Sequence, residues 1–397
     1  MARQVKMKKL NRKLRMGMVG GGPGSFIGDV HVKAARFDGG VELVAGAFDI
    51  DPRKSRLRGR ELYLDPRRVY GTWAEMLKRE RALPPEERID FVAICTPNFL
   101  HYRMAREALE AGFHVVCEKP MTFNVAEAKA LRKIVKRRRR LVFALLHTYT
   151  GYPMVKLARD LVLGGRIGRV LKVVVQYPQG WLAERIEARG QMQAEWRTDP
   201  RRSGASCCMG DIGTHAANLA EYVTGLRITE ICADLGVVVK GRRLDDDGNC
   251  LLRMQGGVRG VLLASQISVG ELNGHRIRVY GEKGFLRWFQ EEPNALAFHR
   301  ADGSVTVYRP GTPAVAELSP LAAAAVRLPA GHPEAFYEAF ANIYRNAVAT
   351  MRARMEGRRP TAVELDFPGV DEGVRGMQFI DLVIRSSRQK RWLKWPK

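Results

Sequence analysis

Three polar residues in this chain have types and spacing suited to moving a proton on and off a small hydroxylated molecule. Asp211 and His215 lie four positions apart in the run Gly-Asp-Ile-Gly-Thr-His. If this run opens a helix, both side chains share one face and can contact the same ligand. Lys119, in Glu-Lys-Pro, adds a compact ammonium that can bind a hydroxyl. We therefore predict Lys119, Asp211 and His215 as catalytic residues that also contact the substrate.

A glycine-rich turn near the start of the chain has the features of a dinucleotide phosphate site. Residues 20–28 read Gly-Gly-Gly-Pro-Gly-Ser-Phe-Ile-Gly, which departs from G-x-G-x-x-G because Ser25 stands three positions after Gly22. The turn follows an apolar strand pattern and opens a helical one, where backbone amides form an anion site. Gly28 would allow the helix to pack closely. The predicted cofactor contacts in this turn are Gly20, Gly22, Gly24, Ser25, Phe26 and Ile27.

Further cofactor contacts are expected where the next strands end. Asp49 stands at the end of the second predicted strand, where a carboxylate can accept hydrogen bonds from the adenosine ribose and so favours NAD. Arg53 and Ser55 lie close by and could bind a 2'-phosphate instead, so NADP stays possible. Residues 96–98 follow the third strand, where the nicotinamide half should lie. The predicted contacts outside the glycine turn are Asp49, Arg53, Thr96, Pro97, Asn98, His101, Glu118 and Lys119.

His215 is the first choice for the base, because oxidation of an alcohol needs a neutral proton acceptor near the hydroxyl. A place in the first turn of a helix would disfavour the imidazolium form. Asp211 would orient the substrate hydroxyls or the imidazole. Lys119 could hydrogen-bond the reacting oxygen or relay the proton itself. The sequence leaves open whether Lys119 or His215 is the base.

The order of predicted elements indicates an α/β fold that begins with a doubly wound parallel Rossmann sheet. Apolar strand runs alternate with helical patterns, and they read as continuous rather than alternating, as burial on both faces demands. The predicted strands are 16–19, 41–48, 89–95, 114–117 and 141–146. We assign residues 1–14 to a flexible basic leader and residues 15–147 to an NAD(P)-binding Rossmann domain.

After residue 147 the sequence changes to longer β-type runs separated by short turns such as Asp247-Gly248. This spacing predicts hairpins and a large, open, mainly antiparallel sheet. The predicted strands are 170–177, 228–239, 250–254, 258–267, 275–281, 285–289 and 295–299, and the predicted helices are 152–163, 211–224 and 333–355. We assign residues 148–397 to a substrate-binding and oligomerisation α/β domain.

The formal net charge of +24 is the one unusual feature of the composition. A field of that size attracts nucleic acid, anionic lipid or acidic metabolites. The run 136–140 is placed like a helix end, where cations complement the helix dipole, and no groove-reading motif is present. We expect a solvated surface and no specific nucleic-acid partner.

Other classes of protein are disfavoured by composition. No stretch approaches the roughly 20 apolar residues that span a bilayer, and no signal-peptide pattern follows the basic start, so we expect a cytoplasmic protein without a membrane partner. Six cysteines in mostly apolar runs suit reduced thiols. A zinc site from Cys207, Cys208, Asp211 and His215 is disfavoured because neighbouring cysteines point in different directions, and we predict no metal.

The glycine turn, Glu-Lys-Pro and Asp-x-x-x-His together resemble the Gfo/Idh/MocA family, which contains glucose-fructose oxidoreductase and inositol dehydrogenase. The resemblance covers nearly the whole chain from Arg15. It implies a Rossmann domain joined to an α/β domain with an open antiparallel sheet, a substrate facing Lys119, Asp211 and His215, and homodimers or homotetramers. The runs 147–153, 177–181 and 196–200 are similar to a subgroup that contains dehydrogenases of anhydrosugars and related sugars.

Aromatic faces and planar donors in those runs suit a sugar ring, although each could equally be a packing residue. The additional predicted substrate contacts are Tyr149, Gln179, Trp181, Trp196 and Arg197. The resulting hypothesis is an NAD(P)-dependent dehydrogenase that oxidises a secondary hydroxyl of a cyclic sugar, anhydrosugar or inositol-like polyol. Two alternatives remain: an NAD-dependent glycoside hydrolase or lyase on the same scaffold, and a non-catalytic sugar or redox sensor.

Overall fold

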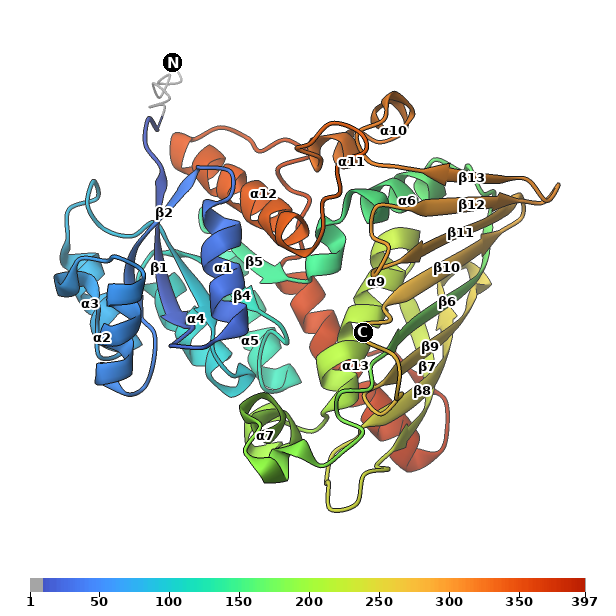
Figure 1. Ribbon diagram of the computed structural model, residues 1–397, viewed down its shortest axis with the longest axis horizontal. Coiled ribbons are helices and arrows are strands. Elements are labelled where there is room, and N and C mark those ends of the chain that lie inside the picture. The colour runs from blue at the N-terminus through green and yellow to red at the C-terminus, as the bar shows by residue number, and fades with distance from the viewer. Residues whose placement is uncertain (1–9, 397) are drawn as a thin grey trace.

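The computed structural model describes residues 10–396, and they form two sheets that lie side by side with helices between and around them (Figure 1). The first sheet has five strands in the order β2-β1-β3-β4-β5, and the second has nine in the order β13-β12-β11-β10-β6-β9-β8-β7-β14. The α/β architecture expected from the sequence is confirmed.

All neighbouring strands of the first sheet are parallel. The strand order reverses between β1 and β3. Open α/β sheets bind ligands at such a point, outside the carboxyl ends of the strands. The strands are β1 Leu14–Gly20, β2 Val41–Ala47, β3 Phe91–Cys95, β4 His114–Glu118 and β5 Phe143–Leu146. The helices are α1 Phe26–Arg36, α2 Pro52–Glu61, α3 Trp73–Ala82, α4 His101–Glu110 and α5 Val125–Arg137.

The second sheet is antiparallel except where β6 runs parallel to β9. Its strands are β6 Val170–Pro178, β7 Ile228–Gly236, β8 Asp247–Met254, β9 Arg259–Ser265, β10 Arg276–Gly281, β11 Gly284–Phe289, β12 Leu296–Arg300, β13 Val305–Tyr308 and β14 Leu393–Lys394. Asp247 and Gly248, expected in a turn, instead begin β8 and pair with Ser265 and Ala264. Helices α6 Pro153–Leu163 and α9 Thr214–Thr224 cover one face of this sheet, and the other face is uncovered in Figure 1.

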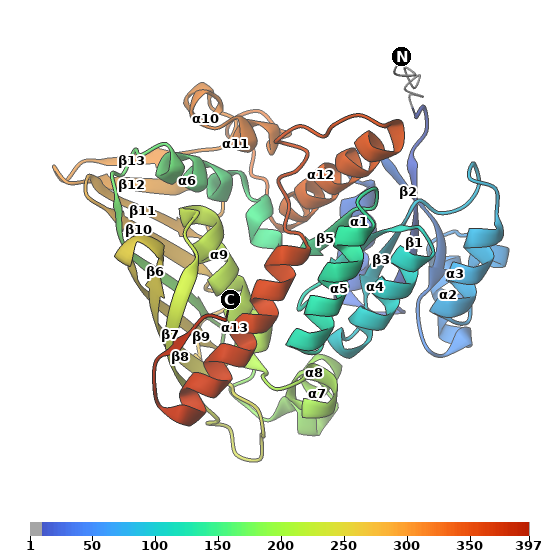
Figure 2. The same ribbon diagram turned by 180° about the vertical axis from the view of Figure 1, so that it is seen from behind.

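Helix α12, Phe336–Glu356, departs from the expected domain division. It lies beside α1 in both views, and its Phe340 and Tyr344 belong to the same buried cluster as Val30 (Figures 1 and 2). Although residues 148–397 were all assigned to the second domain, this segment returns to complete the layer over the first sheet.

Helix α13, Val370–Gln389, was not expected from the sequence. Its apolar stripe is interrupted by Gly373 and Gly376, which weakens the helical pattern. In the structure Phe379 and Leu382 are buried, and the helix lies between α5 and the second sheet (Figure 2). This helix therefore ties the two sheets together.

Residues 1–9 of the predicted leader lie outside the described residues, and residues 10–13 are anchored. Arg12 forms two hydrogen bonds to Asp90, at 2.6 and 2.8 Å. Arg352 of α12 donates to the carbonyl oxygens of Leu10 and Arg12 at 2.6 and 2.8 Å. The end of the leader is therefore fixed rather than flexible. No helix within residues 10–396 is both long enough and apolar enough to cross a membrane.

Candidate active site

An ion pair between Lys119 and Asp211 joins the two domains at the carboxyl end of β4. Lys119 follows β4 directly, and Asp211 lies in the π-helical turn Met209–Gly213 that leads into α9. The Lys119 Nζ atom donates to Asp211 Oδ1 at 2.7 Å and to the Asp211 carbonyl oxygen at 3.0 Å. Two residues that the sequence separates by about ninety positions are thus brought into direct contact.

The second oxygen of Asp211 is also occupied. Arg197 Nε donates to Oδ2 at 3.1 Å, and Gln266 Nε2 donates to it at 3.0 Å. Burial alone would raise the pKa of Asp211, but the charges of Arg197 and Lys119 outweigh burial and hold that pKa well below its usual range. Asp211 therefore acts as a permanent anion that fixes two cations, and it is not available as a base.

The turn that carries Asp211 is held by another carboxylate, Asp245. Its oxygens accept hydrogen bonds from Ser206 Oγ at 3.0 Å and from the backbone amides of Cys207 and Met209 at 3.0 and 2.8 Å. These bonds satisfy donors at the start of the helical segment, in the manner of an N-cap. Sequence reasoning missed Asp245, for which the Asp-Asp-Asp run at 245–247 was the available signal.

His215 is buried and has a histidine as its polar neighbour. Its Nδ1 atom lies 3.3 Å from Nδ1 of His147, and its ring centroid lies 4.8 Å from that of Tyr149 in an edge-to-face arrangement. Burial, followed by the Lys119 charge and by His147, lowers the pKa of His215 well below its ordinary value. We expected the helix dipole to keep this imidazole neutral, whereas burial is the main cause.

Asp211 and His215 were expected to share one helix face and a common ligand. Within the described residues, the carboxylate of Asp211 accepts hydrogen bonds from Lys119, Arg197 and Gln266, whereas the ring nitrogen of His215 contacts His147. The π-helical turn ends between them at Gly213, and the two side chains reach different partners.

Aromatic side chains from three segments form a wall next to His215. The Tyr149 hydroxyl is hydrogen-bonded to the Tyr177 hydroxyl, which donates to Asn273 Oδ1 at 2.7 Å. The His275 ring stacks on Tyr177 with centroids 4.4 Å apart. Burial lowers the pKa values of His147 and His275 to about 3, so the imidazoles of the wall are neutral near pH 7.

The other predicted substrate residues belong to the same network. Gln179 Nε2 donates to Asn273 Oδ1 at 2.8 Å, and Trp181 Nε1 donates to Gln179 Oε1 at 3.1 Å. The Arg197 guanidinium lies 4.3 Å from the Trp196 ring centroid and 5.8 Å from that of Trp181. Of the five additional residues, Arg197 therefore binds Asp211 directly, and Tyr149 contacts His215. The other three are linked to these through Asn273 and Arg197.

Sequence reasoning missed several polar residues of this region: His147, Tyr177, Gln266, Asn273 and His275. His147 and Tyr177 begin the runs 147–153 and 177–181, which had already been singled out, so their positions carried a signal. Gln266, Asn273 and His275 lie at strand ends of the second sheet, and no local pattern marks them.

The glycine turn has backbone conformations and close approaches that only glycine fits well. Gly20, Gly21 and Gly24 have φ values of +84°, +77° and +75°, a region that favours glycine. A Cβ atom on Gly28 would lie 2.5 Å from the Cα atom of Gly21, so the expected close packing of the helix on the turn is present. Ser25 Oγ caps α1 by accepting from the Gly28 amide at 3.1 Å. Phe26 and Ile27 begin that helix, and Phe26 is exposed.

Asp49 lies beside the glycine turn, where the adenosine ribose was expected. A Cβ atom on Gly22 would lie 2.8 Å from Asp49 Oδ2, so the carboxylate borders the turn itself. Arg53 is exposed on α2. Ser55, expected as a possible phosphate ligand, is buried. Its hydroxyl accepts a hydrogen bond from the Phe48 amide and donates one to the Tyr70 carbonyl, both at 3.0 Å, so it has no hydrogen left to donate to a phosphate.

The segment after β3 offers one free polar atom to a cofactor. Asn98 Nδ2 donates to the Ser203 carbonyl at 3.1 Å, whereas the buried Oδ1 atom has no hydrogen-bond partner within the described residues. A buried acceptor of this kind calls for a donor, such as a hydroxyl or carboxamide. Thr96 and Pro97 precede it on the same edge of the sheet.

His101 and Glu118 were also expected to contact the cofactor. The ring nitrogens of His101 lie 2.7 Å from the Thr96 carbonyl oxygen and 2.9 Å from that of Pro120. The imidazole thus braces the loop after β3 against the loop after β4 and leaves no ring nitrogen for a cofactor. Glu118 is buried, and its Oε2 accepts from the Lys119 amide at 3.0 Å.

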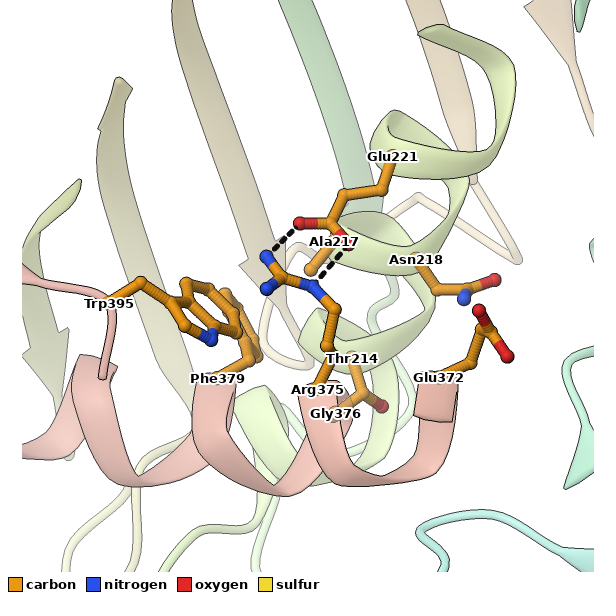
Figure 3. A pocket seen from close by; sticks show the side chains of 9 residues that line it. All are labelled: Thr214, Ala217, Asn218, Glu221, Glu372, Arg375, Gly376, Phe379 and Trp395. Carbon is orange, nitrogen blue, oxygen red and sulfur yellow. Dashed lines mark hydrogen bonds and ion pairs between the residues drawn. The ribbon is translucent and has the colours of Figure 1, made fainter. Parts of the chain in front are cut away.

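Helix α9 is fixed from its far side by α13. Figure 3 shows Arg375 of α13 between Glu221 of α9 and Trp395. Arg375 Nε donates to Glu221 Oε2 at 2.7 Å, and its guanidinium carbon lies 3.9 Å from the Trp395 ring centroid. This contact holds the helix that carries His215.

The described residues contain no group of three or more His, Cys, Asp and Glu side chains arranged to hold a metal ion. Cys207 and Cys208 are both buried, and burial raises the pKa values of both thiols. The Cys207 thiol instead donates to Gln266 Oε1 at 3.4 Å.

Comparison with known proteins shows the family of the chain. Residues 14–145 match the oxidoreductase family with an NAD-binding Rossmann fold, and residues 155–287 match the GFO/IDH/MocA C-terminal domain. An uncharacterized oxidoreductase, YfiI of Bacillus subtilis, is 32% identical over 96% of both chains. Levoglucosan dehydrogenase of Pseudarthrobacter phenanthrenivorans is 28% identical over 57% of this chain and 64% of its own.

The solved structures extend the likeness to the whole fold. An inositol dehydrogenase homolog from Azotobacter vinelandii, complexed with NAD+, is 35% identical, with a TM-score of 0.90 over 98% of this chain and 99% of its own. The complex of such a homolog with NADH and myo-inositol has a TM-score of 0.87 at 34% identity, over 98% of this chain and 100% of its own. The chain belongs to the Gfo/Idh/MocA family and is an NAD-dependent oxidoreductase that acts on CH–OH groups.

Proposed function

We propose that the protein oxidises a secondary hydroxyl of a cyclic polyol, with an inositol-like ring or an anhydrosugar as substrate. The observation that carries this proposal is a buried neutral His215 beside a Lys119–Asp211 ion pair at the carboxyl edge of the Rossmann sheet. The homolog complexed with NADH and myo-inositol and the levoglucosan dehydrogenase named above support this substrate class.

Bound NAD supplies the acceptor for the hydride that leaves the carbinol carbon. The glycine turn, Asp49 and the free Oδ1 of Asn98 fit such a cofactor. Because the Asp49 carboxylate lies against the turn, it can accept a hydrogen bond from a free ribose hydroxyl, whereas it would repel the negative charge of a 2'-phosphate. We therefore propose a preference for NAD over NADP.

His215 takes the hydroxyl proton in this proposal. Since its Nδ1 faces Nδ1 of His147, one of the two atoms must carry the hydrogen of that contact. If His215 Nδ1 carries it, His215 Nε2 keeps its lone pair and can accept the substrate proton. This tautomer assigns the base to His215.

Lys119 binds the reacting oxygen. Its ammonium has three hydrogens, and the side chain and carbonyl of Asp211 account for two donations. The third can hydrogen-bond the substrate oxygen as negative charge develops there. Arg197, held by Asp211 and stacked on Trp196, supplies a planar donor for a neighbouring hydroxyl.

We also propose that the protein is a homodimer or homotetramer through the uncovered face of the second sheet. Leu251, Val261 and Val174 are cross-strand neighbours in one row, and Leu251 is half exposed. A second copy of this face would cover the row, as burial of apolar surface favours.

The test is the absorbance of reduced nicotinamide with NAD or NADP and a panel of inositols, anhydrosugars and free sugars. Lys119→Ala and His215→Ala should abolish steady reduction, while Lys129→Ala, an exposed lysine of α5, should leave it unchanged. If glycosides release a leaving group without net reduction of NAD, the protein is an NAD-dependent glycoside hydrolase or lyase rather than a dehydrogenase. Absence of both NAD reduction and leaving-group release would favour the non-catalytic sugar or redox sensor.

A further inference from the structure

One carboxylate, that of Asp366, binds side chains from two helices of the second domain. Asp366 lies in the connection between α12 and α13, and only 7% of its side chain is exposed. Lys156 and Arg159 of α6 both donate to it, Arg159 Nη1 at 3.2 Å from Oδ1. The Tyr222 hydroxyl of α9 donates to Oδ1 at 3.0 Å. We call these four side chains the α6–α9 clamp.

Both clamped helices begin at the candidate active site, and they pack against one another. His215 is the second residue of α9, and Tyr222 follows it by seven positions, close to two turns, so both side chains share one face. The clamp therefore lies roughly 10 Å along α9 from the ring of His215, at 1.5 Å per residue. Tyr149 lies in the turn Thr148–Gly151 that leads into α6, and Lys156 follows it by seven positions.

The backbone around Asp366 is anchored to the first domain. Asn346 of α12 donates from Nδ2 to the Asp366 carbonyl at 3.0 Å. The amide of Leu145 in β5 donates to the Pro368 carbonyl at 2.8 Å. Leu145 is two residues before His147, the ring that faces the candidate base. The clamp thus connects the strand that leads to His147 with the two helices that begin at the site.

We propose that Asp366 is a positioning residue of the active site: it binds α6 and α9 to a segment fixed on β5 and so keeps the His215 ring against His147 and Tyr149. The inference rests on the proposed function, because it takes His215 as the base. Asp366 and Tyr222 act through the two helices rather than on the substrate.

Loss of the carboxylate charge has a physical consequence for α6. Within residues 10–396, no other acidic side chain forms an ion pair with Lys156, whose side chain is 2% exposed. A buried cation that has lost its counter-ion is strongly unfavourable. Without that charge, Lys156 should move toward water and displace α6 relative to α9.

The activity test compares Asp366→Asn and Tyr222→Phe with Tyr70→Phe. Tyr70 is the matched control because its buried hydroxyl also donates to a buried carboxylate, Glu80 Oε1 at 2.8 Å, but in the first domain before α3. We expect kcat to fall roughly 10- to 100-fold in Asp366→Asn and a few-fold in Tyr222→Phe, since small displacements of reacting groups have effects of this size. KM for NAD should stay unchanged in all three variants. Tyr70→Phe should lose as much thermal stability as Tyr222→Phe but keep the wild-type kcat.

A second readout needs no activity. Amide hydrogen exchange, followed by mass spectrometry, should become faster in Asp366→Asn across residues 147–156 and 209–218, where α6 and α9 begin. Exchange in strands β1 to β3 should stay as in the wild type, and Tyr70→Phe should leave residues 147–156 and 209–218 unchanged. This result would support the inference even if no polyol of the panel were oxidised, so the two proposals can fail separately.

Two outcomes would overturn the inference. One is a wild-type kcat together with wild-type exchange across 147–156 and 209–218 in Asp366→Asn. The other is a loss of kcat accompanied by faster exchange throughout both domains, because a general loss of stability would then explain it. If Asp366→Asn does not fold, Tyr222→Phe is compared with Tyr70→Phe in the same two assays, and equal kcat values in these two variants would refute the role of the clamp.

Discussion

Replacing Asp211 by asparagine is the sharpest perturbation of the proposed site, because one carboxylate holds Lys119, Arg197 and Gln266 at 2.7, 3.1 and 3.0 Å. The side chain keeps its shape but loses its charge, and its nitrogen faces at least one donor. Two cations that lie mostly out of water would then repel one another without a counter-ion. Loss of one hydrogen bond to a charged group removes roughly 1.5–3 kcal/mol of stabilisation.

The expected effect on activity follows from that figure. Both cations are partly exposed, at 15% and 21% of the side chain, which reduces the cost, so we take about 2–3 kcal/mol for the site as a whole. If that energy is lost in the transition state, kcat/KM falls roughly 30- to 150-fold. Thermal unfolding should shift by only a few degrees, because a change of this size is small against the unfolding enthalpy of a large chain.

The assay is steady-state reduction of NAD by Asp211→Asn, by Asp211→Glu and by Asp199→Asn, a control aspartate whose ion-pair partners are Arg201 and Arg243. Asp211→Glu keeps the charge and should lie between the wild type and Asp211→Asn, while Asp199→Asn should match the wild type. A kcat/KM of Asp211→Asn within threefold of the wild type, with NADH binding intact, would refute the idea that this carboxylate organises the two cations.

Three other outcomes are expected. The pKa values of His147 and His275 fall from an ordinary 6.5 to about 3 on burial, so the unfolded chain binds more protons between these limits and stability should rise with pH across them. The slope in urea unfolding should reach about 2.7 kcal/mol per pH unit for the two groups, and His275→Phe should halve it; an unchanged slope would mean that His275 is not buried as a neutral ring. Asp49→Ser should raise kcat/KM for NADP relative to NAD by tenfold or more, as measured with both cofactors, because it removes the carboxylate at the ribose position. Leu251→Asp should convert the oligomer to monomer in light scattering, and an unchanged mass would place the interface elsewhere.

The first sheet could be predicted from the sequence because its signals are local. Strands buried on both faces must be continuously apolar, and the glycines at the end of β1 need positive φ, so both leave marks that a single sequence displays. The same is true of Lys119, Asp211 and His215, whose motifs sit at strand and helix ends. The turn at Asp247 and Gly248 was misread because glycine and aspartate also begin a strand when a neighbouring strand supplies the hydrogen bonds.

The sequence by itself determined the two-sheet α/β class and the place of the glycine turn, and it marked Lys119, Asp211 and His215 as candidates for the site. Only the tertiary structure decided that α12 returns to the first sheet, that His215 meets His147 rather than Asp211, and that His101 and Ser55 are saturated by their own surroundings. The reason is physical: periodicity reports which side of an element is buried, whereas the partner of a buried polar group depends on which distant segment fills the space beside it. The pKa values of the site also depend on tertiary packing, because burial is the leading cause of the shifts at His147, His215 and His275.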